Sequence, residues 1–280
     1  MRSEYIKINR SKLANLIMHI SGKAYSWCLT NSNTELSLPE YALLSRWLKL
    51  LQQGVPLAYI LGFREFFSRN FWVNSYVLIP RQESELLVEI AINSVTTWES
   101  CKFKKKIKIL ELGTGSGAVI ISLVLELIKR GIHVNAHATD LSKNALSVAK
   151  NNALWLGADI SFSRGNWFDA FKLSKQTFDL IIVNPPYVGL NHSEYLSKRE
   201  LSFEPKLALY GLNPSSDGMG DFKKIINGLK ENTQTGSVLI MEHGCMQKKQ
   251  IRILLQSSGL SNFEEFNDHS GLPRLVKVRL

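Results

Sequence analysis

Apolar residues recur at helical spacing in the N-terminal part of the chain. The first stripe consists of Leu13, Leu16, Ile17 and Ile20. The second follows Pro39, which suits a first helical turn, and consists of Leu43, Leu44, Trp47, Leu48 and Leu51. Gly54 and Pro56 end this second helix. The pattern predicts a small all-α bundle over residues 1–62, which either recognises a substrate or only stabilises the chain.

The hydrophobic period changes between residues 63 and 80. Two aromatic clusters, Phe66–Phe67 and Phe71–Val73, flank the polar segment Ser68–Asn70. This alternation predicts a short β-hairpin. We expect residues 63–80 to link the bundle to a larger domain over residues 81–280.

A helix is predicted at the start of that domain, over residues 86–95. Pro80 fixes the entry of the chain, and Ser84 is placed to cap the helix. Glu83 and Glu85 suit the positive end of the helix dipole. Capping therefore explains these carboxylates without a catalytic role.

Strand-like and helix-like segments alternate from residue 106 to the C-terminus. The predicted strands are residues 106–112, 133–139, 160–163, 178–183, 237–241, 262–267 and 274–278. The predicted helices between them are residues 118–129, 145–156, 222–229 and 247–257. Such alternation is typical of an α/β, Rossmann-like fold, a mostly parallel seven-stranded sheet with helices on both faces.

Composition adds little to this picture, apart from charge. The chain has 280 residues, 45% of them hydrophobic and 21% charged, with a formal net charge of +10. A basic chain favours acidic partners such as nucleic acid or ribosome-associated surfaces, although overall charge is weak evidence.

Residues 192–209 are predicted to be a long loop with short helical turns. The basic run Cys101–Lys106 is expected to be a solvated connection, with nucleic-acid contact as the less favoured alternative.

Neither a metal site nor a membrane segment is indicated. The three cysteines and six histidines lack metal-ligand spacing, and scattered, odd-numbered cysteines suit a reducing cytosol. Residues 1–12 are polar, without an apolar signal core. The longest apolar run, residues 118–128, contains Glu126 and is too short to span a bilayer. We therefore expect a cytoplasmic protein.

The tetrapeptide Asn184–Tyr187 follows the predicted buried strand 178–183. Ligands in open α/β sheets bind beyond the carboxyl ends of the strands, so the tetrapeptide is placed where chemistry is done. Pro185 and Pro186 make a rigid corner that presents an amide, carbonyl oxygens and the Tyr187 ring together. A planar NH2 group could donate to Asn184 and a proline carbonyl while stacking on Tyr187. The alternative is an ordinary tight turn.

A glycine-rich turn, Gly113–Gly117, joins the strand 106–112 to the helix 118–129. Its five residues are Gly113, Thr114, Gly115, Ser116 and Gly117. Glycines allow close approach to a ligand, and a helix N-terminus supplies N–H groups. The turn alone does not choose between a nicotinamide cofactor and S-adenosylmethionine.

Two further residues are candidates for cofactor binding. Asp140 ends the strand 133–139 and is expected either to bind both hydroxyls of a ribose or to cap the next helix, and both roles are compatible. Trp167 follows the strand 160–163 and is expected either to flank an adenine or to be part of the core.

Several segments, taken with the glycine turn and Asn184–Tyr187, resemble a known family. They are residues 55–62 (Val-Pro-Leu-Ala-Tyr-Ile-Leu-Gly), 77–81 (Val-Leu-Ile-Pro-Arg), 111–117 (Glu-Leu-Gly-Thr-Gly-Ser-Gly) and 203–209 (Phe-Glu-Pro-Lys-Leu-Ala-Leu). From about residue 36 to its C-terminus the chain is similar to the PrmC/HemK family of class I S-adenosylmethionine-dependent methyltransferases. These enzymes methylate the glutamine of the Gly-Gly-Gln motif in peptide chain release factors.

The resemblance implies a role for each motif. Gly113–Gly117 would hold the methionine part of the cofactor, Asp140 the ribose and Trp167 the adenine. Asn184–Tyr187 would grip the substrate amide, with Asn184 also beside the cofactor. The implied partner is the Gly-Gly-Gln loop of a release factor, bound by a monomer with no membrane and no direct nucleic acid required.

The chain departs from the usual family pattern at three places. Asn166 stands where the family usually has Asp, Phe203 where it has Tyr, and Arg81–Glu85 reads Arg-Gln-Glu-Ser-Glu instead of Arg-Pro-Glu-Thr-Glu.

The alternative substrates are a ribosomal-protein glutamine and the N6 amine of a nucleic-acid adenine. A non-catalytic cofactor-sensing or RNA-binding module is a further alternative, disfavoured by the complete tetrapeptide.

Overall fold

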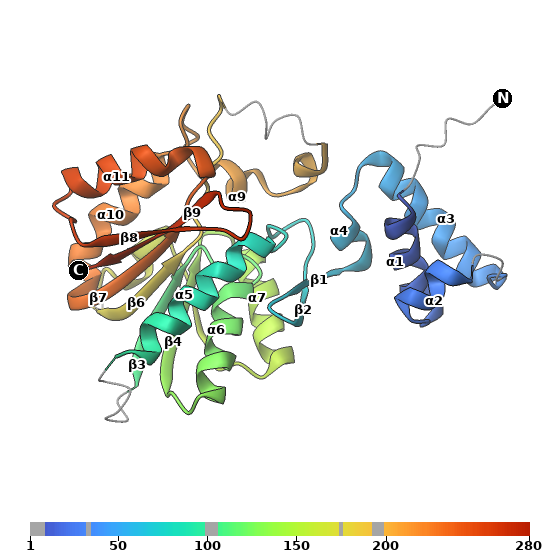
Figure 1. Ribbon diagram of the computed structural model, residues 1–280, viewed down its shortest axis with the longest axis horizontal. Coiled ribbons are helices and arrows are strands. Elements are labelled where there is room, and N and C mark those ends of the chain that lie inside the picture. The colour runs from blue at the N-terminus through green and yellow to red at the C-terminus, as the bar shows by residue number, and fades with distance from the viewer. Residues whose placement is uncertain (1–8, 32–34, 99–105, 174–175, 192–198) are drawn as a thin grey trace.

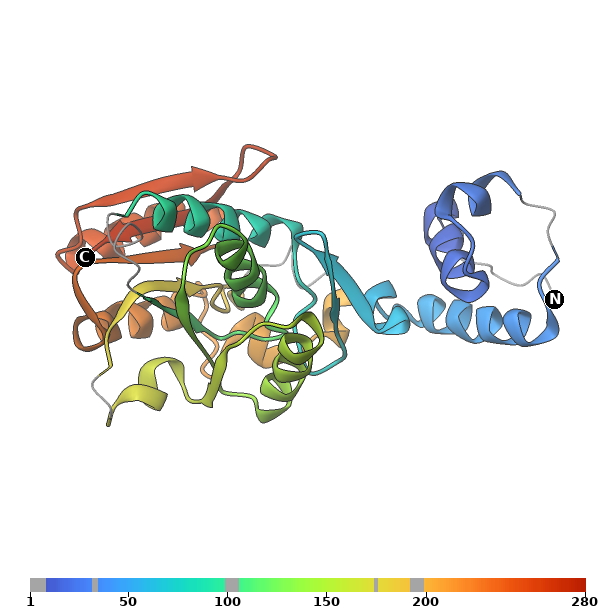
Figure 2. The same cartoon turned by 90° about the horizontal axis from the view of Figure 1, so that it is seen from below.

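The computed structural model describes residues 9–31, 35–98, 106–173, 176–191 and 199–280. Most of the basic run 101–106 and the first part of the predicted loop 192–209, including His192, lie outside these ranges. Figure 1 shows a small helical bundle on one side and a larger α/β body on the other, joined by a narrow connection. Figure 2, turned by 90°, shows the same separation.

The bundle consists of α1 (Arg10–Ser21), α2 (Tyr25–Thr30) and α3 (Leu38–Gln53), followed by the short α4 (Leu57–Leu61). α3 begins at Leu38 with Pro39 in its first turn, as predicted, and Ser37 and Glu40 form a capping box, with Ser37 N donating to Glu40 Oε2 at 2.8 Å. The hydrophobic pattern predicted neither α2 nor α4. α2 has six residues and α4 five, so neither is long enough to show a helical period.

The connection is the antiparallel hairpin of β1 (Phe63–Phe66) and β2 (Arg69–Trp72). The polar segment Ser68–Asn70 lies mostly in β2, and the turn of the hairpin consists of Phe67 and Ser68. Both residues have left-handed backbones, with φ of 49° and 58°. This geometry matches the twist of a tight hairpin but usually requires Asn or Gly. Phe and Ser at these positions therefore did not indicate a turn.

The body contains a seven-stranded sheet in the order β5-β4-β3-β6-β7-β9-β8. Its strands are β3 (Ile107–Leu112), β4 (Val134–Asp140), β5 (Ser161–Arg164), β6 (Phe178–Val183), β7 (Thr233–Glu242), β8 (Phe263–Asn267) and β9 (Pro273–Arg279). The first five in the spatial order pair in parallel, and β9 is antiparallel to both β7 and β8. The predicted α/β fold with a mostly parallel sheet is confirmed.

Helices cover both faces of this sheet, as the ribbon shows (Figure 1). α5 (Glu85–Thr96), α6 (Ala118–Lys129) and α7 (Lys143–Leu156) lie on one face, and α10 (Gly220–Asn232) and α11 (Lys248–Ser257) on the other. Adjacent strand residues pack on opposite faces, Ile109 toward α5 and α6, Leu110 toward α10 and α11. The central strands are therefore buried on both sides, which explains their continuous apolar runs.

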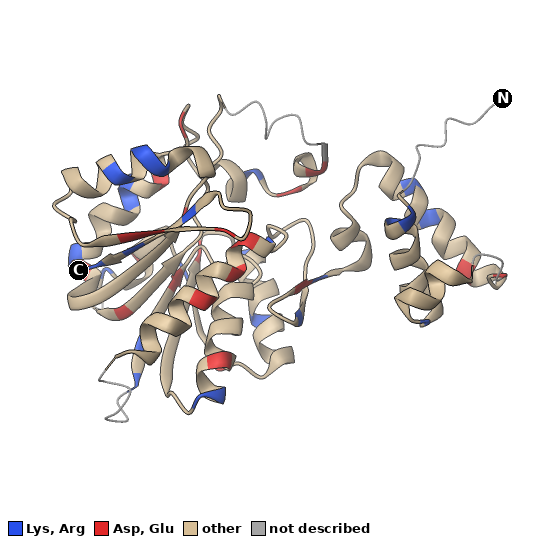
Figure 3. Cartoon of the chain, viewed as in Figure 1, with Lys and Arg blue, Asp and Glu red and all other residues tan. Residues whose placement is uncertain are grey.

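Short elements complete the body near the carboxyl ends of the parallel strands. They are the 3₁₀ helices η1 (Gln82–Ser84), η3 (Trp167–Phe171), η4 (Arg199–Phe203) and η5 (Cys245–Gln247), and the helix α9 (Lys206–Tyr210). No helix among the described residues is long and apolar enough to cross a bilayer. Lys and Arg occur on α1, α10 and α11 in the view of Figure 3, whereas acidic residues are prominent on α5 and β8.

Candidate active site

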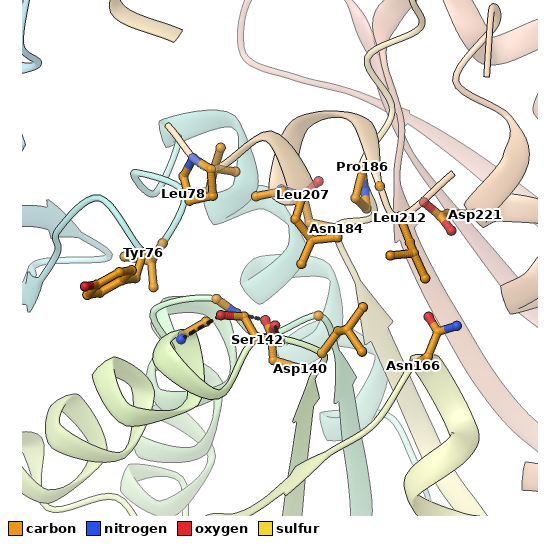
Figure 4. A pocket seen from close by; sticks show the side chains of 18 of the residues that line it. Tyr76, Leu78, Asp140, Ser142, Asn166, Asn184, Pro186, Leu207, Leu212 and Asp221 are labelled. Carbon is orange, nitrogen blue, oxygen red and sulfur yellow. Dashed lines mark hydrogen bonds between the residues drawn. The ribbon is translucent and has the colours of Figure 1, made fainter. Parts of the chain in front are cut away.

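Two cavities meet at the carboxyl end of β6. The first has a volume of about 220 Å³ and the second about 570 Å³. Leu78, Asn184 and Ala208 line both. Figure 4 shows Asn184, Leu78 and Leu207 on one side of the first cavity, facing Asp140 and Ser142 on the other. A ligand in either cavity would thus lie beside the same amide side chain.

The rest of the tetrapeptide divides between these cavities. Pro186 lines the first, whereas Pro185 and Tyr187 line the second. Gln247 Nε2 donates to the Tyr187 carbonyl at 3.1 Å, and the next peptide N–H, that of Val188, donates to the Leu209 carbonyl. The corner is therefore tied on both sides to the elements that surround it.

The glycine turn places only some of its residues at the first cavity. Gly113 and Gly115 line it. Thr114 and Ser116 are buried, the Thr114 hydroxyl donates to Glu111, and the Ser116 carbonyl accepts from Asn152 Nδ2 at 2.8 Å. Gly117 has φ of 81° and packs so tightly that an added Cβ would lie 2.8 Å from Ile121 Cδ1. The turn is thus shaped by packing at one end and open to a ligand at the other.

Asp140 organises this turn. Its Oδ2 accepts from Gly115 N at 2.9 Å and its Oδ1 from Ser142 N at 2.8 Å. Burial raises the pKa of the Asp140 carboxyl, and these two hydrogen bonds oppose the rise. The cap of α7 is Ser142, whose Oγ accepts from Ala145 N. Asp140 therefore lines the first cavity from a fixed position while supporting the cap through the Ser142 backbone.

Trp167 also lines the first cavity, against Gly113. A Cβ at Gly113 would lie 3.4 Å from the indole ring, so glycine leaves room for the ring to lie close. Trp167 Nε1 donates to Asp221 Oδ1 at 3.3 Å, and the Trp167 backbone has φ of 54°. Such a strained conformation in a bulky residue persists only where its surroundings hold it.

The second cavity is lined by charged groups. Glu204 Oε1 accepts a hydrogen bond from Arg81 Nη2 at 2.5 Å, and Glu204 Oε2 accepts one from Ile79 N at 3.1 Å. These two bonds fix the entry of the chain into η1. Arg274 and Glu242 also line this cavity. Arg274 is paired with the buried Asp268 at 3.0 Å. Arg81 and Glu204 are therefore paired within the lining, whereas Arg274 is paired with a residue outside it.

Known proteins resemble both parts of the chain. Residues 103–270 match the model of a methyltransferase domain, and residues 2–62 match the PrmC N-terminal domain. A release factor glutamine methyltransferase of Neisseria gonorrhoeae is 38% identical over 80% of this chain and 76% of its own. The chain belongs to the PrmC/HemK family of methyltransferases.

A second relative of this PrmC/HemK family member is longer, and a solved structure shares only its fold. A bifunctional methyltransferase of Rickettsia bellii is 32% identical over 99% of this chain. The present chain spans about half of that longer protein, 52%. The catalytic domain of human Mettl16 has a TM-score of 0.57 at 14% identity, covering 99% of this chain and 95% of that one. The latter likeness supports the class I methyltransferase fold alone.

One expectation about this PrmC/HemK site was wrong. Ser84 does not cap α5 with its side chain. Its Oγ donates to Glu242 Oε2 at 2.6 Å and accepts from Asn184 Nδ2 at 3.2 Å. A hydroxyl bonds to whichever acceptor the fold brings closest, and here that acceptor is 158 positions away in the sequence.

Sequence reasoning missed several residues that line the two cavities. They include Leu78, Leu207, Asp221, Glu242 and Arg274. One signal was present for Glu242, because a carboxylate that directly follows the apolar strand residues Ile240–Met241 belongs to the same sheet edge as Asn184. Leu78 and Leu207 lie in the segments 77–81 and 203–209, which resemble the family, but their residue types alone do not indicate a ligand.

Proposed function

We propose that this protein transfers a methyl group from S-adenosylmethionine to the side-chain amide nitrogen, N5, of the glutamine in the Gly-Gly-Gln motif of peptide chain release factors. The reaction would support translation termination. The observation that carries this proposal is the meeting of two cavities at Asn184, since a methyl donor and an amide acceptor must approach one another at one point. The printed name of the Neisseria relative supports the same substrate.

The residues of the first cavity fit the proposed methyl donor. Asp140 presents a carboxylate at the edge where a ribose binds in related folds, and Trp167 offers an aromatic face for adenine. Gly113 and Gly115 leave open backbone for the methionine part, while Thr114, Ser116 and Gly117 hold the turn from behind. S-adenosylmethionine, when bound, supplies an electrophilic methyl group on its sulfonium.

The second cavity then receives the glutamine side chain. An amide nitrogen is a poor nucleophile, because its lone pair is delocalised into the carbonyl. Asn184 Oδ1 and the Pro185 carbonyl accept its two hydrogens, and Tyr187 holds the amide plane. A hydroxyl or carboxylate would leave these acceptors unpaired. Positioning of this kind supplies roughly 7–11 kcal/mol of barrier reduction in favourable cases.

The decisive experiment is peptide mass spectrometry after mixing the purified protein, S-adenosylmethionine and an unmodified release factor. We expect one methyl group on the Gly-Gly-Gln glutamine, and none when that glutamine is changed to alanine. A methyl group found instead on a ribosomal protein or on adenine in nucleic acid would move the function to those substrates. The family and the fold would be unaffected by that outcome.

The setting of the reaction is part of the proposal. A release factor as substrate places the enzyme in the cytoplasm, where translation occurs. We propose that a monomer is active and that neither nucleic acid nor a membrane is needed. Light scattering of the active fraction, with turnover unchanged by nuclease treatment, would test these points.

A further inference from the structure

Three polar side chains from distant parts of the sequence form a hydrogen-bonded chain that ends at the proposed substrate amide. Glu242 ends β7, Ser84 ends η1, and Asn184 follows β6. Ser84 Oγ lies 2.6 Å from Glu242 Oε2 and 3.2 Å from Asn184 Nδ2. Ser84 and Glu242 are 3% and 1% exposed, so little water competes for these bonds.

The chemistry of these groups fixes the direction of each hydrogen bond. An ionised carboxylate only accepts, so Ser84 must donate its single hydroxyl hydrogen to Glu242. The Ser84 oxygen then has only lone pairs to offer, and it accepts only if Asn184 presents its NH2 group. An amide whose NH2 group faces Ser84 turns its Oδ1 away. The opposite amide orientation would set two acceptors against each other.

We propose that Ser84 and Glu242 are positioning residues, which lock the Asn184 amide so that Oδ1 accepts a hydrogen from the substrate nitrogen. This inference rests on the proposed function, in which Asn184 Oδ1 holds that nitrogen. Without the lock, the Asn184 amide is free to turn over and present its NH2 group to the NH2 group of the substrate. Two donors would then face one another, and the hydrogen bond that holds the substrate nitrogen would be lost.

The lock depends on pH because Glu242 titrates. Burial raises the pKa of Glu242 to about 7, while the Ser84 hydrogen bond and the charges of Arg274 and Arg81 lower it and Glu83 raises it. Above this pKa the carboxylate only accepts and the direction of both bonds is set. Below it the protonated carboxyl can donate to Ser84, whose hydrogen can then point at Asn184. We therefore expect kcat to rise as the pH increases through about 7.

Turnover of four full-length chains tests the role: the wild type, Ser84→Ala, Ser84→Thr and Glu242→Gln. At pH 8, Ser84→Ala should lower kcat about 100-fold, the loss expected for a misplaced reacting group. Its affinity for S-adenosylhomocysteine, measured by calorimetry, should stay at the wild-type value. Ser84→Thr keeps the hydroxyl and should restore kcat. Glu242→Gln does not titrate and should abolish the rise near pH 7.

A matched control removes a hydroxyl from the neighbouring helix. Ser94, on α5, is buried, and its Oγ has no hydrogen-bond partner among the described residues. Ser94→Ala should therefore leave kcat and its pH profile unchanged. Wild-type turnover in Ser84→Ala, or a rise near pH 7 that persists in Glu242→Gln, would overturn the positioning role.

A readout without substrate separates this inference from the proposed function. In ¹⁵N spectra, the Asn184 side-chain NH2 resonance, assigned by its loss in Asn184→Ala, should shift with pH near 7 in the wild type and not in Glu242→Gln. A pH-independent resonance in the wild type would contradict the lock. If the shift is present but the release factor is left unmodified, the proposed substrate is wrong and the lock stands.

Discussion

Asn184 is the residue on which the proposed transfer most depends. Asn184→Ala removes the acceptor that orients the substrate nitrogen, so turnover should fall to background. Cofactor affinity should weaken only modestly, since Gly113, Asp140 and Trp167 remain in the first cavity. Methyl transfer to the release factor and calorimetry with S-adenosylhomocysteine measure the two effects. Asn93→Ala, at an exposed position on α5, is the control, and wild-type turnover in Asn184→Ala would refute the role.

Glu111, buried at the end of β3, makes stability depend on pH. Burial raises its pKa to about 8, despite hydrogen bonds from Thr114 and the Ile120 backbone. Because the folded state then holds a proton that the unfolded state releases above about pH 4.5, the contribution of Glu111 to stability is present at low pH and lost as pH rises through about 8.

Glu111→Gln should therefore gain stability relative to the wild type as the pH increases from 5 to 8. The slope is at most about 1.4 kcal/mol per pH unit for one group. Urea unfolding of both proteins across this range measures it. Glu264→Gln, on the exposed side of β8, is the control. A difference between Glu111→Gln and the wild type that does not vary with pH would contradict this account.

Single residues show where sequence reasoning works and where it stops. Asn184 and Asp140 were identifiable because each directly follows a buried strand, and strand ends meet at one edge of a parallel sheet. Ser84 was placed correctly at the start of a helix but given the wrong partner. Its partner, Glu242, is selected by tertiary packing, and local propensity contains no information about that choice.

At the scale of elements, the glycine turn before α6 requires glycine for two different reasons, backbone conformation and close packing. Gly115 and Gly117 both have positive φ, 56° and 81°, so alanine at either is strained by about 1–2 kcal/mol. At Gly117 an added Cβ would also approach Ala149 Cβ to 3.3 Å, whereas at Gly115 no described atom outside its chain neighbours lies within 4 Å.

Gly117→Ala should therefore destabilise the protein more than Gly115→Ala, by a further 1–3 kcal/mol or so from overpacking. Urea unfolding of the two variants gives the difference directly. Gly115→Ala serves as the matched control for backbone strain, and it should instead reduce cofactor affinity, since Gly115 lines the first cavity. Equal losses of stability would show that packing behind Gly117 is unimportant.

The predicted elements were accurate where burial dictates the pattern. The strand at Phe178–Val183 was predicted without error, because both its faces are covered by helices. β7 begins at Thr233 instead of residue 237, since its first residues are polar and lie at the sheet margin. The two turn residues of the hairpin were not identifiable, because Phe67 and Ser68 adopt a conformation that their side chains do not favour.

At the scale of the whole molecule, the helical bundle contacts the body sparingly. Lys12 of α1 pairs with Glu200 of η4 at 2.9 Å, with both side chains about half exposed, so the pair is worth at most about 1 kcal/mol. α4 is different, because Tyr59 Oη donates to the Val77 carbonyl at 2.6 Å and Ala58 packs on the same cluster. We therefore propose that a truncation should keep α4.

A chain beginning at residue 55 should remain folded and methylate a short Gly-Gly-Gln peptide with wild-type kcat. We propose that the bundle recognises the release factor, so kcat/KM of this shortened chain on the intact factor should fall. Lys12→Ala in the full chain is the control for loss of the ion pair and should change neither value. Equal kcat/KM of the shortened chain and the wild type on the intact factor would show that the bundle only stabilises the chain.

The shared wall of the two cavities also defines a route to selective inhibition. A single compound that joins an adenosine-based group to a glutamine-like amide, through a linker of only a few atoms at the transferred position, would occupy both cavities at once. Tethering makes the second binding event intramolecular, so its affinity should exceed that of either half alone. Methyltransferases whose acceptor is not an amide would lack the matching half, and selectivity would follow from the side chain that both cavities share.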